Sequence, residues 1–184
     1  MNVIEANNIA CPIDGDNLVS SGKQLNCSNG HSFDIARQGY VNLLPVQHKR
    51  SKQPGDSKAM VLARSDFLDS GIYEPIAEKL NALVLSQMTE DKDHCILDAG
   101  CGEGYYLDSL CHFLRAQERD RNVSFIGLDI SKDAIIQSSR RNKQICWLVG
   151  TNRQPPVLTE SIDIILCLFG FVNMQAFSKI LKPG

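Results

Sequence analysis

The residues best suited to chemistry lie in one glycine-rich stretch, Leu97-Asp98-Ala99-Gly100-Cys101-Gly102-Glu103-Gly104. Glycine is needed where the backbone takes a positive φ or touches a ligand closely. The spacing is G-x-G-x-G, whereas the dinucleotide fingerprint is G-x-G-x-x-G, which disfavours a nicotinamide cofactor. Asp98, directly before the glycines, suits the ammonium group of S-adenosylmethionine. We therefore expect a cofactor-binding loop that includes Gly100, Gly102 and Gly104.

A second acidic residue, Asp129, ends an apolar segment 25 residues beyond Gly104. A carboxylate at the end of the second strand can accept hydrogen bonds from both hydroxyls of a ribose. The alternative is a turn with three glycines and an unrelated aspartate. Agreement between strand, loop, helix and second acid favours the cofactor site.

The segments that would position these residues alternate between strand and helix. Apolar runs predict strands at 95–99, 123–130, 145–149 and 162–169, and helical spacing predicts helices around 107–114, at 132–142 and after Asn173. Two further helices are expected between Ser57 and Val84, interrupted at Gly71. Such alternation implies an α/β Rossmann-like fold with four parallel strands. Because Lys182-Pro183-Gly184 is a helix exit, we expect the sheet to lack its last strands.

Three regions are expected along the chain. Residues 1–36 hold few apolar side chains, and a segment this short normally needs a metal or a host domain to stay folded. Residues 37–58 contain prolines and a basic cluster, with Arg37 and Arg64 nearby, and are predicted to be a connector. Residues 59–184 form the S-adenosylmethionine-binding domain, expected to be C-terminally incomplete. The basic cluster consists of His48, Lys49, Arg50 and Lys52.

Composition narrows the classes of protein. Hydrophobic residues make up 43% and charged residues 22%, as in globular domains. The longest apolar run has nine residues, Ile164 to Val172, far short of the roughly 20 that cross a bilayer. The net charge of −2 argues against general attraction to nucleic acid. We expect a cytoplasmic protein that does not bind membranes.

Several segments together resemble one family. They are His31-Ser-Phe-Asp34, Gly39 to Arg50, Pro54-Gly-Asp56, Phe67-Leu-Asp69 and Gly102-Glu-Gly-Tyr-Tyr106. They are similar to the bacterial large-subunit rRNA guanine-N1 methyltransferases, which are class I S-adenosylmethionine methyltransferases. The resemblance implies methyl transfer to N1 of a guanine in a hairpin of 23S rRNA. It also implies that Tyr73, Gly102 and Glu103 contact the cofactor, and that the basic cluster contacts RNA phosphates.

The resemblance extends to a metal site near the N-terminus. Its candidate ligands are Cys11, Asp14, Cys27 and His31. The family pattern is C-x2-C…C-x3-H, a zinc site of three thiolates and one imidazole, and here Asp14 replaces the second cysteine. Aspartate can ligate zinc, but oxygen is a harder donor than sulfur, so affinity should fall. The resulting expectation is a zinc-ribbon-like module with one structural zinc. The alternative is a zinc-free module held by the packing of Phe33 and Ile35.

The reaction itself leaves alternatives open. No catalytic residue can be named, although N1 of guanine carries a proton that must leave. Cys167 is interpreted as a core residue rather than a nucleophile, and Phe169 either stacks on a base or lies in the core. The alternatives are a methyltransferase acting on a small molecule or protein, or a catalytically inactive RNA-binding fragment. The expected partners are 23S rRNA and, as an open alternative, a second copy of the chain.

Overall fold

The computed structural model describes residues 7–45, 54–89, 92–118 and 123–183. The predicted RNA-contacting residues lie outside these ranges: His48, Lys49, Arg50 and Lys52. Within the described ranges, no helix is both long and apolar enough to span a membrane.

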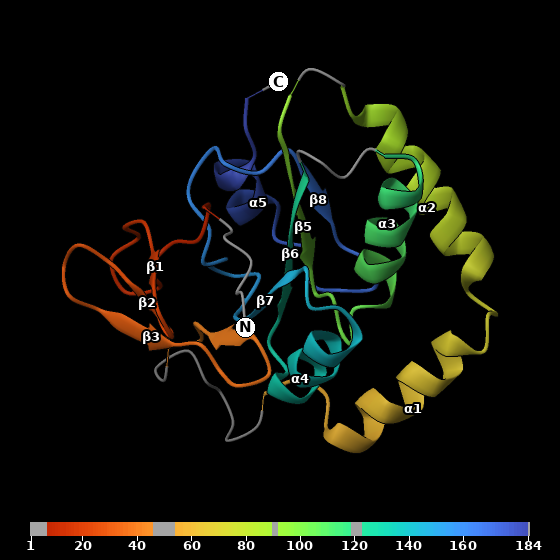
Figure 1. Ribbon diagram of the computed structural model, residues 1–184, viewed down its shortest axis with the longest axis horizontal. Coiled ribbons are helices and arrows are strands. Elements are labelled where there is room, and N and C mark those ends of the chain that lie inside the picture. The colour runs from red at the N-terminus through yellow and green to blue at the C-terminus, as the bar shows by residue number, and fades with distance from the viewer. Residues whose placement is uncertain (1–6, 46–53, 90–91, 119–122, 184) are drawn as a thin grey trace.

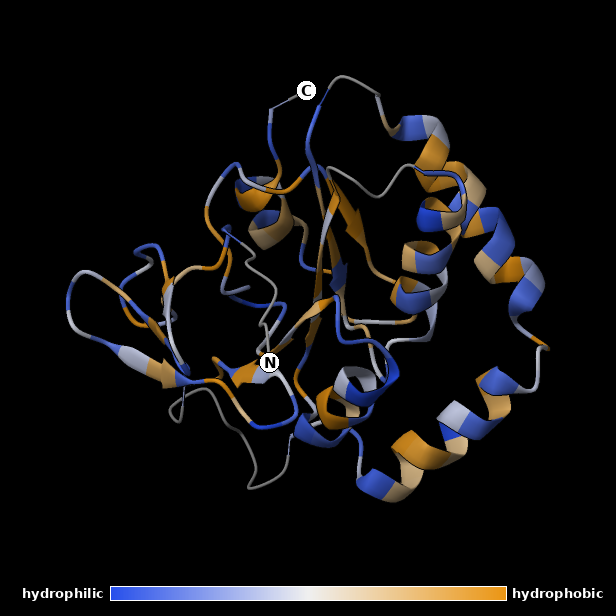
Figure 2. Ribbon diagram, viewed as in Figure 1, coloured by the Kyte–Doolittle hydropathy of each residue, from blue (hydrophilic) through white to orange (hydrophobic). Residues whose placement is uncertain are grey.

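A five-stranded parallel sheet forms the centre of the molecule (Figure 1). Its order is β4 (Tyr40–Asn42), β7 (Cys146–Val149), β6 (Val123–Asp129), β5 (His94–Ala99) and β8 (Ile164–Leu166). Every neighbouring pair of strands is parallel. The predicted α/β fold with a parallel sheet is therefore confirmed. Figure 2 shows hydrophobic residues along the central strands.

The prediction of four strands was wrong, because β4 comes from the segment interpreted as a connector. β4 pairs with β7, Tyr40 lying opposite Trp147. Its three residues are too few to show a periodicity, and its partner is more than a hundred residues away. The strand predicted at 162–169 is also shorter, because Ile162 bridges to Leu181 instead and Phe169 has a φ of +59°.

Helices α2 (Glu74–Gln87), α3 (Tyr105–Ala116) and α4 (Lys132–Arg141) cover one face of the sheet. Alternation along β5 explains both faces: Ile96 points into this core, whereas Leu97 points into the core on the other side. Helix α1 (Lys58–Asp69) precedes α2 and lies against α4. As predicted, the hydroxyl of Ser131 caps α4 by accepting a hydrogen bond from the Ala134 amide at 3.2 Å.

The other face is covered by helix α5 (Met174–Ile180) and the N-terminal module (Figure 1). The module is an antiparallel meander of β1 (Val19–Ser21), β2 (Gln24–Asn26) and β3 (Ser32–Asp34). Leu18 and Leu25 join the same apolar cluster as Leu97. The Ala10 amide donates to the Pro156 carbonyl at 3.0 Å. The module thus shares its core with the host domain.

Candidate cofactor site and zinc centre

A cavity of about 740 Å³ opens at the carboxyl ends of the central strands. This edge of the sheet is where α/β folds bind ligands, because helix N-termini and loop amides converge there. The lining includes the loops that follow β5, β6, β7 and β8, together with the side of α1 that faces them. Five of the predicted cofactor residues line the cavity: Tyr73, Gly100, Gly102, Glu103 and Asp129.

Asp129 is held in place by two backbone amides. Its Oδ2 accepts a hydrogen bond from the Gly102 amide at 3.0 Å, and its Oδ1 accepts one from the Ser131 amide at 2.7 Å. Burial raises the pKa of Asp129, although both hydrogen bonds favour the ionised form. A carboxylate oxygen can accept more than one hydrogen bond, so a ribose hydroxyl can be added without displacing either amide.

Two other predicted cofactor residues, Asp98 and Gly104, lie outside the cavity lining. Gly104 has a φ of +86° and opens α3, and a Cβ there would lie 2.7 Å from the Trp147 ring. This glycine is therefore required for backbone conformation and packing. Asp98 is 2% exposed at the end of β5. Burial raises its pKa to about 8, and the charges of Asp129 and Glu103 add to the shift.

Arg64 on α1 also lines the cavity, although the sequence had grouped it with the basic connector. It forms an ion pair with Asp56, and its Nη1 lies 4.0 Å from Oε2 of Glu103. The Glu103 side chain is buried, and Oε2 has no hydrogen-bond partner among the described residues. Burial raises the pKa of Glu103, and Arg64 opposes that shift. No local sequence pattern joins α1 to the glycine loop.

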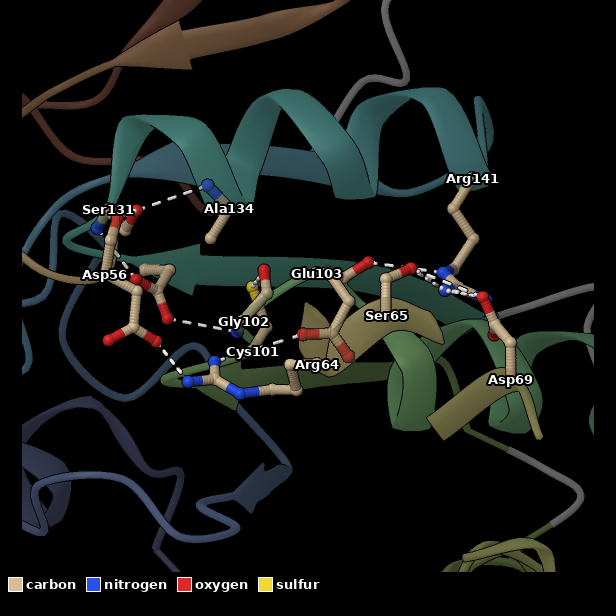
Figure 3. A network of polar contacts seen from close by, with 11 residues as sticks. Asp56, Arg64, Ser65, Asp69, Cys101, Gly102, Glu103, Ser131, Ala134 and Arg141 are labelled. Carbon is tan, nitrogen blue, oxygen red and sulfur yellow. Dashed lines mark hydrogen bonds and ion pairs between the residues drawn. The ribbon is translucent and has the colours of Figure 1, made fainter. Parts of the chain in front are cut away.

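A second arginine, Arg141 at the end of α4, ties α1 to the same loop (Figure 3). Its Nη1 and Nη2 donate to the two carboxylate oxygens of Asp69 at 2.8 and 3.0 Å. Nη2 also donates to the Ser65 hydroxyl at 3.0 Å, and Nε donates to the Glu103 carbonyl at 3.3 Å. The network therefore joins three segments that are distant in sequence.

Aromatic rings form the rim of the cavity. The Tyr73 ring packs edge-on against Phe67 at 5.6 Å and against Phe169 at 6.4 Å between centroids. Phe169 is 82% exposed, which excludes the core position, one of the two alternatives left open for it. Cys167 packs against the apolar cluster under β5, and burial raises its pKa, in agreement with the predicted core role.

The four candidate zinc ligands come together in the N-terminal module, where their ligand atoms all lie within 4.8 Å of one another. His31 Nδ1 lies 3.5 Å from Cys11 Sγ, 3.3 Å from Cys27 Sγ and 3.0 Å from Asp14 Oδ2. Ordinary zinc–ligand distances in a tetrahedron place neighbouring ligand atoms about 3.3–3.8 Å apart. The residues present therefore fit a closed zinc site.

Asp14 is oriented as a ligand by its neighbours. Its Oδ2 accepts a hydrogen bond from the Asn29 amide group at 3.0 Å, and its Oδ1 accepts one from the Asp16 backbone amide at 3.0 Å. Hydrogen bonds from Cys11 and Asn29 hold the pKa of Asp14 well below its ordinary value. The carboxylate is thus fixed in its ionised form, as ligation requires.

Comparison with known proteins agrees with both parts of this architecture. Residues 9–52 match the zinc-ribbon family model described as "RlmA, N-terminal", and residues 96–184 match the model described as "Methyltransferase domain". The chain is 31% identical over 176 residues to the putative 23S rRNA (guanine-N(1)-)-methyltransferase YxjB of Bacillus subtilis, covering 94% of this chain. The chain belongs to the RlmA-like methyltransferase family. The predicted family is therefore confirmed.

A second RlmA-like relative is the 23S rRNA (guanine(748)-N(1))-methyltransferase of Streptomyces fradiae, 33% identical over 177 residues and 96% of this chain. The chain spans 60% of the length of each of these two relatives. A crystal structure of a SAM-dependent methyltransferase from Aquifex aeolicus superposes with a TM-score of 0.54 at 17% identity, covering 70% of this chain and 69% of that one. This likeness shows the class I methyltransferase fold.

Proposed function

We propose that this RlmA-like chain takes part in S-adenosylmethionine-dependent methylation of N1 of a guanine in 23S rRNA. The observation that carries the proposal is the cavity in which Gly102 and Asp129 face each other at the carboxyl edge of the sheet. The names of both relatives support the RNA substrate. The proposed target hairpin rests on the family resemblance.

The residues that would hold the cofactor fit its chemistry. S-adenosylmethionine supplies a methyl group already activated by a sulfonium. Asp129 would accept the ribose hydroxyls, and the backbone of Gly100 and Gly102 would lie against the cofactor. The Glu103 carboxylate, whose Oε2 accepts no hydrogen bond among the described residues, suits the ammonium group. The contribution of the protein is then mainly positioning, which can supply several powers of ten in rate.

The aromatic rim supports a planar target. Phe169 is exposed beside Tyr73 at the mouth of the cavity, and base–aromatic stacking contributes about 1–3 kcal/mol per base. A guanine that leaves the RNA base stack would stack on these aromatic rings instead. The rim therefore favours a nucleobase over an aliphatic small molecule.

The basic cluster remains part of the proposal. We expect His48, Lys49, Arg50 and Lys52 to contact RNA phosphates. Replacing Lys49 and Arg50 together with glutamine should weaken RNA binding regardless of sequence. It should also reduce the slope of log affinity against log salt by about one per cation lost. A salt dependence equal to that of the wild type would exclude these contacts.

The substrate is tested in a strain whose gene for this protein is deleted and then restored. N1 lies on the Watson–Crick edge, so its methylation blocks reverse transcription at one nucleotide. We expect a stop in 23S rRNA that disappears on deletion and returns with the wild-type gene but not with an Asp129→Ala version. An identical stop profile in all strains would point to a small-molecule or protein substrate, or to an inactive RNA-binding chain. The homodimer stays a prediction that size determination in solution can check.

A further inference from the structure

Acidic side chains outnumber basic ones in the described lining of the cavity. Three acids line it, Asp56, Glu103 and Asp129, and the cations in the described lining are Arg64 and Arg153. The amino-acid end of S-adenosylmethionine carries an ammonium and a carboxylate on the same carbon. The carboxylate cannot lie beside these acids unless a cation or several amides receive it.

Arg64 lies directly over the glycine loop. Its Nη1 would be 3.4 Å from a Cβ placed on Gly102, which puts the guanidinium against the part of the backbone that faces Asp129. One nitrogen, Nη2, pairs with Asp56. Nη1 points toward Glu103 across a distance of 4.0 Å, too long for a hydrogen bond (Figure 3).

The Glu103 carboxylate, which faces Arg64, lacks a hydrogen-bond donor among the described residues. Its side chain is 2% exposed, and Oε2, the atom nearest Arg64, has no hydrogen-bond partner in the described part of the chain. A buried carboxylate oxygen normally accepts a hydrogen bond, because burying it without one is unfavourable. Arg64 and Glu103 thus form a long ion pair of 4.0 Å with no hydrogen bond between them. A ligand that carries both an ammonium and a carboxylate could give each of these side chains a hydrogen-bond partner.

Arg153 is the competing cation, and it is already engaged. Its guanidinium lies 5.6 Å from the centre of the Phe171 ring in a cation–π contact. Arg153 also lines a second groove, beside Pro12 of the N-terminal module and Lys179 of α5. It is therefore shared with a surface that lies away from Gly102 and Glu103.

We propose that Arg64 receives the α-carboxylate of S-adenosylmethionine while Glu103 receives its α-ammonium. This inference rests on the proposed function, and it assigns Arg64 a role in binding the cofactor. With Nη2 paired to Asp56, Nη1 is the guanidinium nitrogen that can donate to the carboxylate, and the pair with Asp56 holds it in that orientation. Because Arg64 belongs to α1, the assignment also makes this helix part of the cofactor site.

The test uses two ligands that differ only in the amino-acid end. S-adenosylhomocysteine keeps the ammonium and carboxylate, whereas 5′-methylthioadenosine lacks both. Calorimetry with the whole chain should show that Arg64→Gln weakens binding of S-adenosylhomocysteine ten- to a hundredfold and changes binding of methylthioadenosine less than twofold. Arg64→Lys, which keeps the charge, should show a smaller loss with the same selectivity. It also serves as the test if Arg64→Gln does not fold. Arg140→Gln, an exposed change on α4, is the matched control.

Three results would overturn the assignment. Equal weakening of both ligands would mean that Arg64 only supports the fold, and no weakening of either would mean that it makes no contact. A selective loss in Arg153→Gln instead of Arg64→Gln would transfer the carboxylate to Arg153. In each case, an Asp129→Ala variant that bound neither ligand would still support the location of the cofactor site. If the wild type bound neither ligand, the proposed function would fail first.

Discussion

The contact between Arg141 and Asp69 should be a main support of helix α1. The two residues are 72 positions apart and meet through two hydrogen bonds of 2.8 and 3.0 Å. Arg141 also holds Ser65 and the Glu103 carbonyl. Replacing Arg141 with alanine removes all four hydrogen bonds, which tie α4 to α1 and to the loop that lines the cavity.

The magnitude follows from the exposure of the two side chains. A hydrogen bond to a charged group contributes about 1.5–3 kcal/mol when buried. The Arg141 side chain is 17% exposed, but that of Asp69 is 48% exposed, so solvent screens the pair and lowers its contribution. We therefore expect Arg141→Ala to lower the free energy of unfolding by about 2 kcal/mol, with about 1 kcal/mol of it coupled to Asp69. For a chain of this size, this corresponds to a fall in Tm of about 4–8 °C.

Urea denaturation of Arg141→Ala, Asp69→Asn and the double variant measures the coupling directly. Arg140→Ala, one residue earlier on the exposed side of α4, is the control and should change stability by less than about 0.5 kcal/mol. The hydrogen bond from Arg141 lowers the pKa of Asp69 below its ordinary 3.8. The contribution of the pair is therefore present above that pH and is lost as pH falls below it. A coupling energy near zero at pH 7, or an Arg140→Ala effect as large as that of Arg141→Ala, would refute the reasoning.

Three other predictions concern single residues. Gly104→Ala should lower the free energy of unfolding by about 3 kcal/mol or more, because it adds a clash with Trp147 to a positive φ. Gly71→Ala is the control, because Gly71 has the same φ of +86° but an added Cβ would lie 3.7 Å from its nearest neighbour. It should lower the free energy of unfolding by only about 1–2 kcal/mol, and equal losses for the two variants in urea denaturation would contradict the clash with Trp147. Asp14→Cys should retain more zinc than the wild type after dialysis against a chelator, and Asp14→Ala less, because thiolate is the softer ligand; equal metal content in all three would exclude the site. Since burial raises the pKa of Asp98 to about 8, the unfolded chain loses this proton near pH 4 and the folded chain near pH 8. As the pH rises from 5 to 8, the urea midpoint of the wild type should therefore fall more than that of Asp98→Asn. An equal change in the two midpoints between pH 5 and 8 would contradict this prediction.

Local patterns predicted much of the fold. The apolar run of β5 and the cap at Ser131 were visible because each depends on neighbouring residues. β4 was missed, since a three-residue strand takes its identity from a partner far along the chain. The early end of β8 was also missed, because it depends on the positive φ of Phe169 and on the pairing of Ile162 with Leu181.

The candidate site was predicted only in part, because some of its contacts depend on local sequence and others on segments that are distant along the chain. The glycine motif predicted the loop and Asp129, which do meet at the cavity. The motif could not distinguish Gly102, which faces the cavity, from Gly104, which faces Trp147. The role of Arg64 depends on how α1 lies over the loop, and no spacing within either segment records that arrangement.

A crystal structure of the chain with S-adenosylhomocysteine would test the cofactor site most directly. The ribose hydroxyls should lie within hydrogen-bond distance of the Asp129 carboxylate while the Gly102 amide still donates to it. Electron density for the ligand outside this cavity would contradict the cofactor site. So would a ligand in the cavity whose ribose makes no contact with Asp129, leaving its carboxylate bonded only to the Gly102 and Ser131 amides.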